Sequence, residues 1–231
     1  MHERLVAREL TLPVYAFSRC GVRPLADAYR ALVAQYDIDL IVLVDGGTDS
    51  LIFGDEPGLG TVVEDAVSII AACQANGHDR TLLATTGLGI DQFHGVSNYS
   101  FLENTARLNH DGNFLGSVSV VHGTPEAYAL YSLVEYANRR QPSHRSIVCN
   151  SLVSAIEGEF GGRQVPGRTE GGEIFIHPLM AQYWVFYAEA VAASMRFGDA
   201  LAETETFAEA SLVIETVRET LTIRRRLPLP L

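Results

Sequence analysis

The stretch that most constrains the fold of this chain is residues 38–60, where an apolar run ends in a turn rich in glycine and acidic residues. The run from Ile38 to Val44 predicts a strand buried on both faces, as in a parallel sheet covered by helices. In such sheets, ligands bind just beyond the carboxyl ends of the strands. We therefore expect a ligand site in the loop that follows, DGGTDSLIFGDEPGLG.

Apolar segments of strand and helix length alternate along the chain, which predicts a three-layer, Rossmann-like α/β fold with a mostly parallel sheet and helices on both faces. The expected strands cover residues 14–17, 38–44, 80–87 and 173–178, and the expected helices cover residues 24–36, 62–75, 96–108, 124–140, 179–196 and 202–225. Residues 116–123 are a further strand or an extended connection, and residues 146–158 are a strand entering a helix or one long helix.

We find no internal repeat and no strong linker, so we expect residues 1–231 to form a single domain. The helices within about 179–225 are expected to pack on this domain or on a partner subunit, and a homo-oligomer is expected. Thr61 and Glu64 have the spacing of a capping box, which marks the start of the helix 62–75.

Charge and residue usage exclude several functions. The net charge of −11 argues against binding to nucleic acid, which needs clustered basic residues. All 17 basic residues are arginine. A chain without lysine has no P-loop lysine and cannot form a Schiff base with pyridoxal phosphate.

Cysteine usage and hydropathy indicate a cytoplasmic protein. The three cysteines are far apart in the sequence, as is typical of a reducing compartment. No signal peptide is recognisable, and no apolar run reaches the roughly 18 residues of a membrane span.

Asp45 and Asp49 flank the turn Gly46-Gly47 and are the leading candidates for a site. Glycine lets a ligand approach the backbone closely. The two carboxylates could hold Mg²⁺ through oxygen ligands, or one could bind sugar hydroxyls while the other acts as a general base. The structural alternative is that each aspartate caps a turn. Ser50 is a further candidate for contact with the substrate.

Two more acidic pairs follow in the sequence. Asp55 and Glu56 are adjacent, and we expect one of them to face the site as a catalytic acid or base; the alternative is a solvated loop. Glu64 and Asp65 fall in the first turn of a helix, where acidic residues are favoured by the helix dipole. For this second pair we prefer the structural interpretation.

The second strand ends in Gly87-Leu88-Gly89-Ile90-Asp91, which we expect at the same sheet edge as the first acidic loop. The glycines are candidates for substrate contact, and Asp91 or His94 could complete the site. The full dinucleotide-binding fingerprint is absent, because Gln92 stands at its last glycine. Residues 161–172, rich in glycine, are expected to form a lid in which Arg163 or Arg168 meets an anionic group.

These motifs resemble a family known as domain of unknown function 1152. Its members carry a strand, D-x-G-G-D-S, G-D-E-P-G-L, a helix, and a second strand ending in G-x-G-x-D. The segments LVDGGTDSLIFGDEPGLGT, NSLVSAIEGEFG and HPLMAQYWVF carry the resemblance here. Members usually begin with a further βαβ unit that holds a glycine-rich turn. The resemblance implies either that this chain is a shortened version or that the unit lies outside the printed sequence. Members also often have Gly-Glu where Gln92-Phe93 stands. The resemblance implies no activity.

We therefore expect an enzyme that acts on a small, polar, nucleotide- or sugar-like molecule. Its acidic pocket would lie at the carboxyl edge of the sheet and could hold Mg²⁺. The alternative is a ligand-binding or assembly protein without catalytic activity.

Overall fold

The computed structural model describes residues 13–77, 80–165, 169 and 172–229, and the chain divides into two compact units. The sheet unit comprises residues 19–118 and 183–231. The second unit comprises residues 1–18 and 119–182. The expectation of one domain stays a prediction.

The main sheet is mixed, so the prediction of a mostly parallel sheet is wrong. Its strands are β1 (Ile41–Asp45), β2 (Thr81–Thr85), β3 (Phe114–Ser119) and β6 (Gln182–Tyr187), in the order β1-β2-β6-β3. β1 and β2 are parallel, with Asp45 beside Thr85, whereas β6 runs antiparallel to β2. The mixed α/β class is confirmed.

The sheet is mixed because residues 179–196 do not form the single helix that their apolar character predicted. They form the short 3₁₀ helix η3 (Pro178–Ala181), then β6, then α7 (Ala188–Ser194). The sequence of β6 is QYWVFY, and aromatic and β-branched residues favour strands. The alanine-rich segment after it favours helix.

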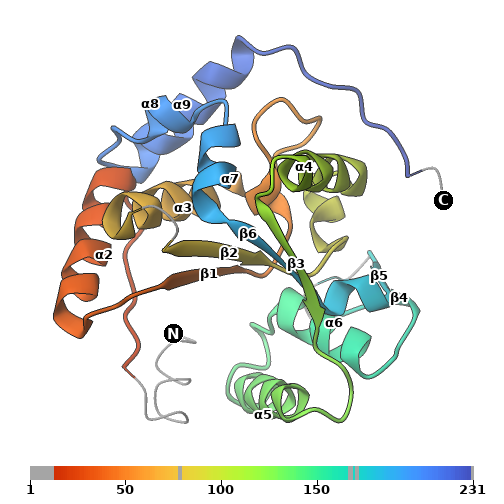
Figure 1. Ribbon diagram of the computed structural model, residues 1–231. Coiled ribbons are helices and arrows are strands. Elements are labelled where there is room, and N and C mark those ends of the chain that lie inside the picture. The colour runs from red at the N-terminus through yellow and green to blue at the C-terminus, as the bar shows by residue number, and fades with distance from the viewer. Residues whose placement is uncertain (1–12, 78–79, 166–168, 170–171, 230–231) are drawn as a thin grey trace. The chain divides into compact units, whose positions relative to one another are not determined.

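In the sheet unit, three helices begin and end within about two residues of the predicted positions, 24–36, 62–75 and 96–108, whereas the helix predicted over 202–225 is shorter and covers residues 207–219. The helices of this unit are α2 (Val22–Tyr36), α3 (Val62–Asn76), α4 (Asn98–His110), α7, α8 (Gly198–Leu201) and α9 (Phe207–Glu219), with the 3₁₀ helices η1 (Asp49–Leu51) and η2 (Ile90–His94). α3 is central, since it contacts α2, β1, β2, α7 and α9 (Figure 1).

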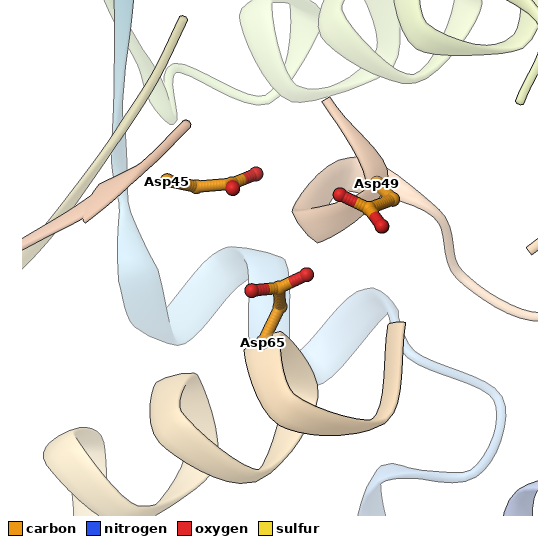
Figure 2. A group of neighbouring side chains, drawn as sticks. All are labelled: Asp45, Asp49 and Asp65. Atoms are coloured by element: carbon orange, nitrogen blue, oxygen red, sulfur yellow. The ribbon is translucent and has the colours of Figure 1, made fainter. Parts of the chain in front are cut away.

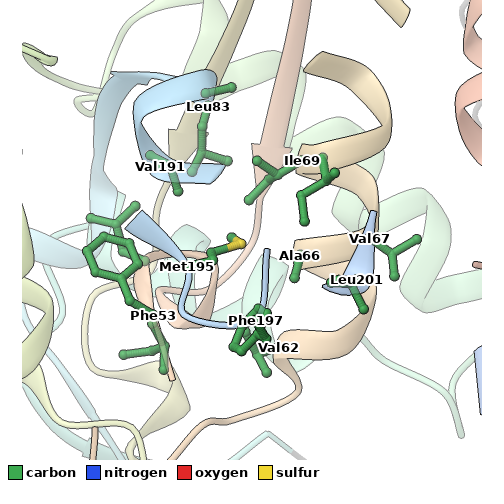
Figure 3. Packing of buried hydrophobic residues seen from close by; sticks show 14 of the residues in the cluster. Phe53, Val62, Ala66, Val67, Ile69, Leu83, Val191, Met195, Phe197 and Leu201 are labelled. Carbon is green, nitrogen blue, oxygen red and sulfur yellow. The ribbon is translucent and has the colours of Figure 1, made fainter. Parts of the chain in front are cut away.

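The core of the sheet unit forms around α3. Ala66, Ile69 and Ala71 of α3 are almost fully buried, and Leu83 of β2 and Val191 of α7 belong to the same cluster (Figure 3). This packing fixes the position of the first turn of α3. The other face of β1 is open, with Val42 and Val44 exposed at 50% and 65%. The prediction that this strand is buried on both faces is therefore wrong.

The second unit contains two helices and a small antiparallel sheet. Its elements are α5 (Pro125–Arg140), α6 (Ile147–Ile156), β4 (Gly161–Arg163), β5 (Ile174–Ile176) and η3. Thr124 caps α5 by accepting a hydrogen bond from the backbone of Ala127, as a Thr-Pro start predicts. Residues 146–158 contain a helix and no strand. Residues 14–17 form no strand, and Val14 and Phe17 stay about 40% exposed, so the run buries too little to stabilise one.

Asp55 and Glu56 contact Arg224, which lies in the segment that follows α9. Glu56 is fully buried and accepts hydrogen bonds from the backbone of Phe53 and Gly54 and from Asn104 Nδ2. Arg224 Nη2 lies 2.6 Å from Glu56 Oε1 and 2.9 Å from Asp55 Oδ1. Through Arg224, these two acids connect the loop after β1 to the segment that follows α9.

In the described part of the chain, no helix combines the length and the apolar character needed to cross a bilayer.

We expect Arg224→Ala to destabilise the protein, because it leaves the buried Glu56 carboxylate without its cation. The expected loss in the free energy of unfolding is about 2 kcal/mol, less than for a fully buried pair because the Arg224 side chain is 24% exposed. Urea unfolding measures this loss. The neighbouring Arg225→Ala, an exposed site, is the matched control. Equal losses in the two variants would contradict the role assigned to Arg224.

Candidate functional site

Three aspartates from different elements point toward one another at the end of β1. Asp45 is the last residue of β1, Asp49 begins η1, and Asp65 lies in the first turn of α3 (Figure 2). One carboxylate oxygen from each residue lies within 4.8 Å of the other two. We call these residues the aspartate cluster.

The parallel pairing of β1 with β2 brings both predicted acidic loops to one edge of the sheet. The backbone N–H of Thr86 donates to the carbonyl of Asp45, so the two loops begin side by side. Asp91 Oδ2 then accepts hydrogen bonds from Thr48, at 2.6 Å from its backbone N and 3.4 Å from its hydroxyl. Asp91 therefore holds the turn between Asp45 and Asp49 in place.

Asp49 is fixed by Thr61. Its Oδ2 accepts hydrogen bonds from the backbone N and the hydroxyl of Thr61, at 2.7 and 2.8 Å. The Thr61 hydroxyl therefore makes no cap hydrogen bond, and the predicted capping box with Glu64 is absent. Both of these hydrogen bonds use Oδ2. Among the described residues, the structure shows no hydrogen bond to Oδ1 of Asp49.

The turn that carries the cluster leaves no room for side chains at two glycines. A Cβ atom at Gly47 would lie 2.6 Å from Asp91 Oδ2 and 3.0 Å from Asp49 Oδ1. Gly60 has a φ of +66°, and a Cβ atom there would lie 2.6 Å from Asp49 Oδ2. Glycine at both positions is thus required by the packing of the carboxylates.

Burial and mutual repulsion disfavour the charged forms of these carboxylates. Burial raises the pKa of Asp45 to about 7, and the charges of Asp49 and Asp91 add to this rise. Burial also raises the pKa of Asp65 well above its usual range, helped by the same neighbours. The pKa of Asp91 rises to about 6 through burial and the charge of Asp49. A cation bound among them would remove this penalty.

A cavity of about 380 Å³ opens beside the cluster. Asp45, Gly46, Ser50 and Asp65 line it, together with residues of α2, α3, β1 and β2. The Ser50 hydroxyl lies near enough to Asp45 to lower its pKa, yet it forms no hydrogen bond of acceptable geometry with the described residues. A fully buried hydroxyl of this kind is available to a ligand.

The other predicted site residues lie outside the cluster. Asp55 and Glu56 hold Arg224, so the structure gives no support to a catalytic role for them. Gly87 and Gly89 shape the turn after β2, with φ values of +79° and +96°, and His94 is exposed at the end of η2. In the second unit, Arg163 pairs with Glu159. Arg168 lies outside the described residues.

Asp65 is the member of the aspartate cluster for which the sequence interpretation preferred a structural role. Its position in the first turn of a helix has a sufficient explanation in the helix dipole. The signal that could have identified it is topological. In a parallel β-loop-α-loop-β unit, the helix begins at the edge where the preceding strand ends, so an inward-facing acid in its first turn meets the loop after that strand.

The donor set of the cluster fits a divalent cation with oxygen ligands. Opposite ligands of Mg²⁺ lie about 4.2 Å apart and those of Ca²⁺ about 5 Å apart, given their usual metal–oxygen distances. Only one pair among three ligands can be opposite, so the three oxygens, which lie within 4.8 Å of one another, would have to move closer together for all of them to contact one ion. Carboxylates that burial keeps partly protonated would release protons to such an ion.

We expect the stability of the metal-free protein to fall as the pH rises. A carboxyl whose pKa is raised on folding binds more protons in the folded than in the unfolded state, so stability is full below about pH 4 and is lost as the pH rises through about 7. Between about pH 5 and about pH 8, the wild type should lose at least about 1 kcal/mol more than Asp45→Asn, as measured by urea unfolding with a chelator present. Asp199→Asn, at an exposed site, should follow the wild type. A parallel pH dependence in Asp45→Asn and the wild type would refute this assignment.

Comparison with known proteins places the chain in a family without naming a reaction. No curated protein and no solved structure matches the chain. The family model described as protein of unknown function (DUF1152) matches residues 2–220, which is most of the chain and includes the whole aspartate cluster. The resemblance inferred from the acidic motifs is therefore confirmed, and the chain belongs to the DUF1152 family.

Proposed function

We propose that the aspartate cluster binds one divalent cation and that the protein is an enzyme acting on a small polar molecule in the adjacent cavity. The observation that carries this proposal is the convergence of three carboxylates within 4.8 Å beside a cavity of about 380 Å³. Cavities that bind small molecules have volumes of roughly 300–1,000 Å³.

The place of the cluster in the fold supports a site. β1, α3 and β2 form a parallel crossover, and the acidic loops follow the carboxyl ends of its strands. Ligands of Rossmann-like sheets bind at that edge. The cation would polarise an oxygen of the substrate or activate a water molecule. The substrate would be a nucleotide- or sugar-like molecule.

The residues divide into two groups under this proposal. Asp45, Asp49 and Asp65 would hold the cation. Asp91 and Thr61 act as positioning residues, because their hydrogen bonds fix the turn and the Asp49 side chain. Of the two acidic residues in the first turn of α3, only Asp65 belongs to the cluster, so variants of Glu64 and Asp65 should differ in their effect on cation binding.

We expect the wild type to bind one Mn²⁺ ion and Asp65→Asn to bind it at least about tenfold more weakly, because the site loses one of its three charges. Electron paramagnetic resonance of free Mn²⁺ measures both affinities. Glu64→Gln is the matched control, since Glu64 is the adjacent acid of the same turn and pairs with Arg19 at the surface. Equal affinities in the three proteins would contradict the proposal, as would absence of Mn²⁺ binding by the wild type.

A second experiment distinguishes an enzyme from a binding protein without catalytic activity. Thermal-shift screening of the Mn²⁺-loaded protein with nucleotides and sugars identifies ligands, and nuclear magnetic resonance of each ligand then reports turnover. Turnover that is lost in Asp49→Asn would support an enzyme. Ligand binding without turnover would support a binding protein.

A further inference from the structure

The wall of the cavity beyond the carboxylates is made of hydroxyl groups and apolar side chains. Tyr29 of α2 and Ser68 of α3 line it beside Ser50. Ser68 lies one helical turn after Asp65, so the two side chains share one face of α3. The apolar part of the wall consists of Leu43, Val44, Ile69 and Leu83.

The charge of the cavity lining disfavours a ligand that is held directly by a phosphate group. Among the described residues that line the cavity, none is an arginine, and the chain contains no lysine. Three carboxylates carry more charge than one divalent cation neutralises, so the loaded site keeps no positive charge. Phosphate sites use arginine, lysine, a bound divalent cation or helix N-termini that offer free N–H groups, and of these the loaded cavity offers only the cation and the start of α3, beside three carboxylates.

The hydroxyl groups, in contrast, match the hydrogen-bonding pattern of a sugar or polyol. The Ser50 hydroxyl is fully buried and has no hydrogen-bond partner of acceptable geometry among the described residues. The Tyr29 phenol and the Ser68 hydroxyl both belong to the cavity wall, and burial raises the pKa of Tyr29 above its ordinary value, so the phenol is a neutral donor at physiological pH. Hydroxyl groups both donate and accept, as do those of a sugar.

We propose that the cavity binds a neutral polyhydroxylated compound, a sugar or polyol without a phosphate in the cavity, and that Tyr29 and Ser68 contact its hydroxyl groups. Carboxylates and the cation would bind further hydroxyls, and the C–H groups of the ligand would pack on Leu43. This inference rests on the proposed cation site, and it assigns ligand-binding roles to two residues outside the aspartate cluster.

The test uses the full chain loaded with Mn²⁺ and isothermal titration with D-ribose, myo-inositol, inorganic phosphate, ribose 5-phosphate and inositol 1-phosphate. We expect at least one neutral compound to bind, and its phosphorylated counterpart to bind at least about tenfold more weakly because of repulsion by the carboxylates. Tyr29→Phe should weaken binding of the neutral compound by about threefold to tenfold, the loss of one hydrogen bond, and leave the Mn²⁺ affinity unchanged.

Tyr36→Phe is the matched control, because Tyr36 ends the same helix and lies outside the cavity wall, 46% exposed. Tighter binding of a phosphorylated compound, binding of none of the neutral compounds, or an unchanged affinity in Tyr29→Phe would each overturn the inference. If Mn²⁺ binds normally in these samples, such a result leaves the cation site standing. If Mn²⁺ does not bind, both proposals fail.

Discussion

Repulsion among carboxylates is the constraint on which the site depends. Three acidic side chains lie within 4.8 Å of one another, and a fourth, Asp91, raises the pKa of Asp45 through its charge. Like charges at this distance in a half-buried site oppose folding unless protons or a cation neutralise them. The fold holds them together through backbone hydrogen bonds from Thr48 and Thr61 and through the packed core around α3. An arrangement that opposes stability and is held so firmly is typical of a functional site.

The sequence predicted where the two acidic loops meet more accurately than which acidic residues form the cluster. The end of β1, the turn with two glycines and the second acidic loop after β2 were all expected at one edge, and the parallel register of β1 and β2 confirms this. Asp55 and Glu56 looked equally suitable as acids of a site. Their partner, Arg224, lies about 170 residues away in the sequence, and no local pattern reveals a contact over such a separation.

The errors in the fold have a related cause. Residues 179–196 are mostly apolar, and an apolar run without clear periodicity does not distinguish a buried helix from a buried strand. The strand conformation of residues 182–187 depends on a tertiary contact. Leu83 and Ala84 of β2 pair with Phe186 and Val185, which makes this segment an antiparallel strand of the sheet. The exposure of Val42 and Val44 on β1 has a similar explanation. It depends on which elements cover that face of the sheet, and the hydropathy of one strand does not indicate this.

The geometry gives Asp49 and Asp91 different roles, although the sequence suggested the same role for both. Asp91 and Asp49 both follow strand-edge glycines, and both accept hydrogen bonds from a threonine backbone and hydroxyl. Both use only Oδ2 for these hydrogen bonds, but Asp49 belongs to the group of three carboxylates within 4.8 Å of one another, whereas Asp91 holds the Thr48 turn beside that group. A residue that fixes a ligand-bearing turn is as necessary as the ligands themselves, because a cation discriminates between sites by the spacing of its oxygen donors. The acidic motif of this chain is therefore best understood as a rigid frame, provided by Thr48, Thr61 and Asp91, around three carboxylates.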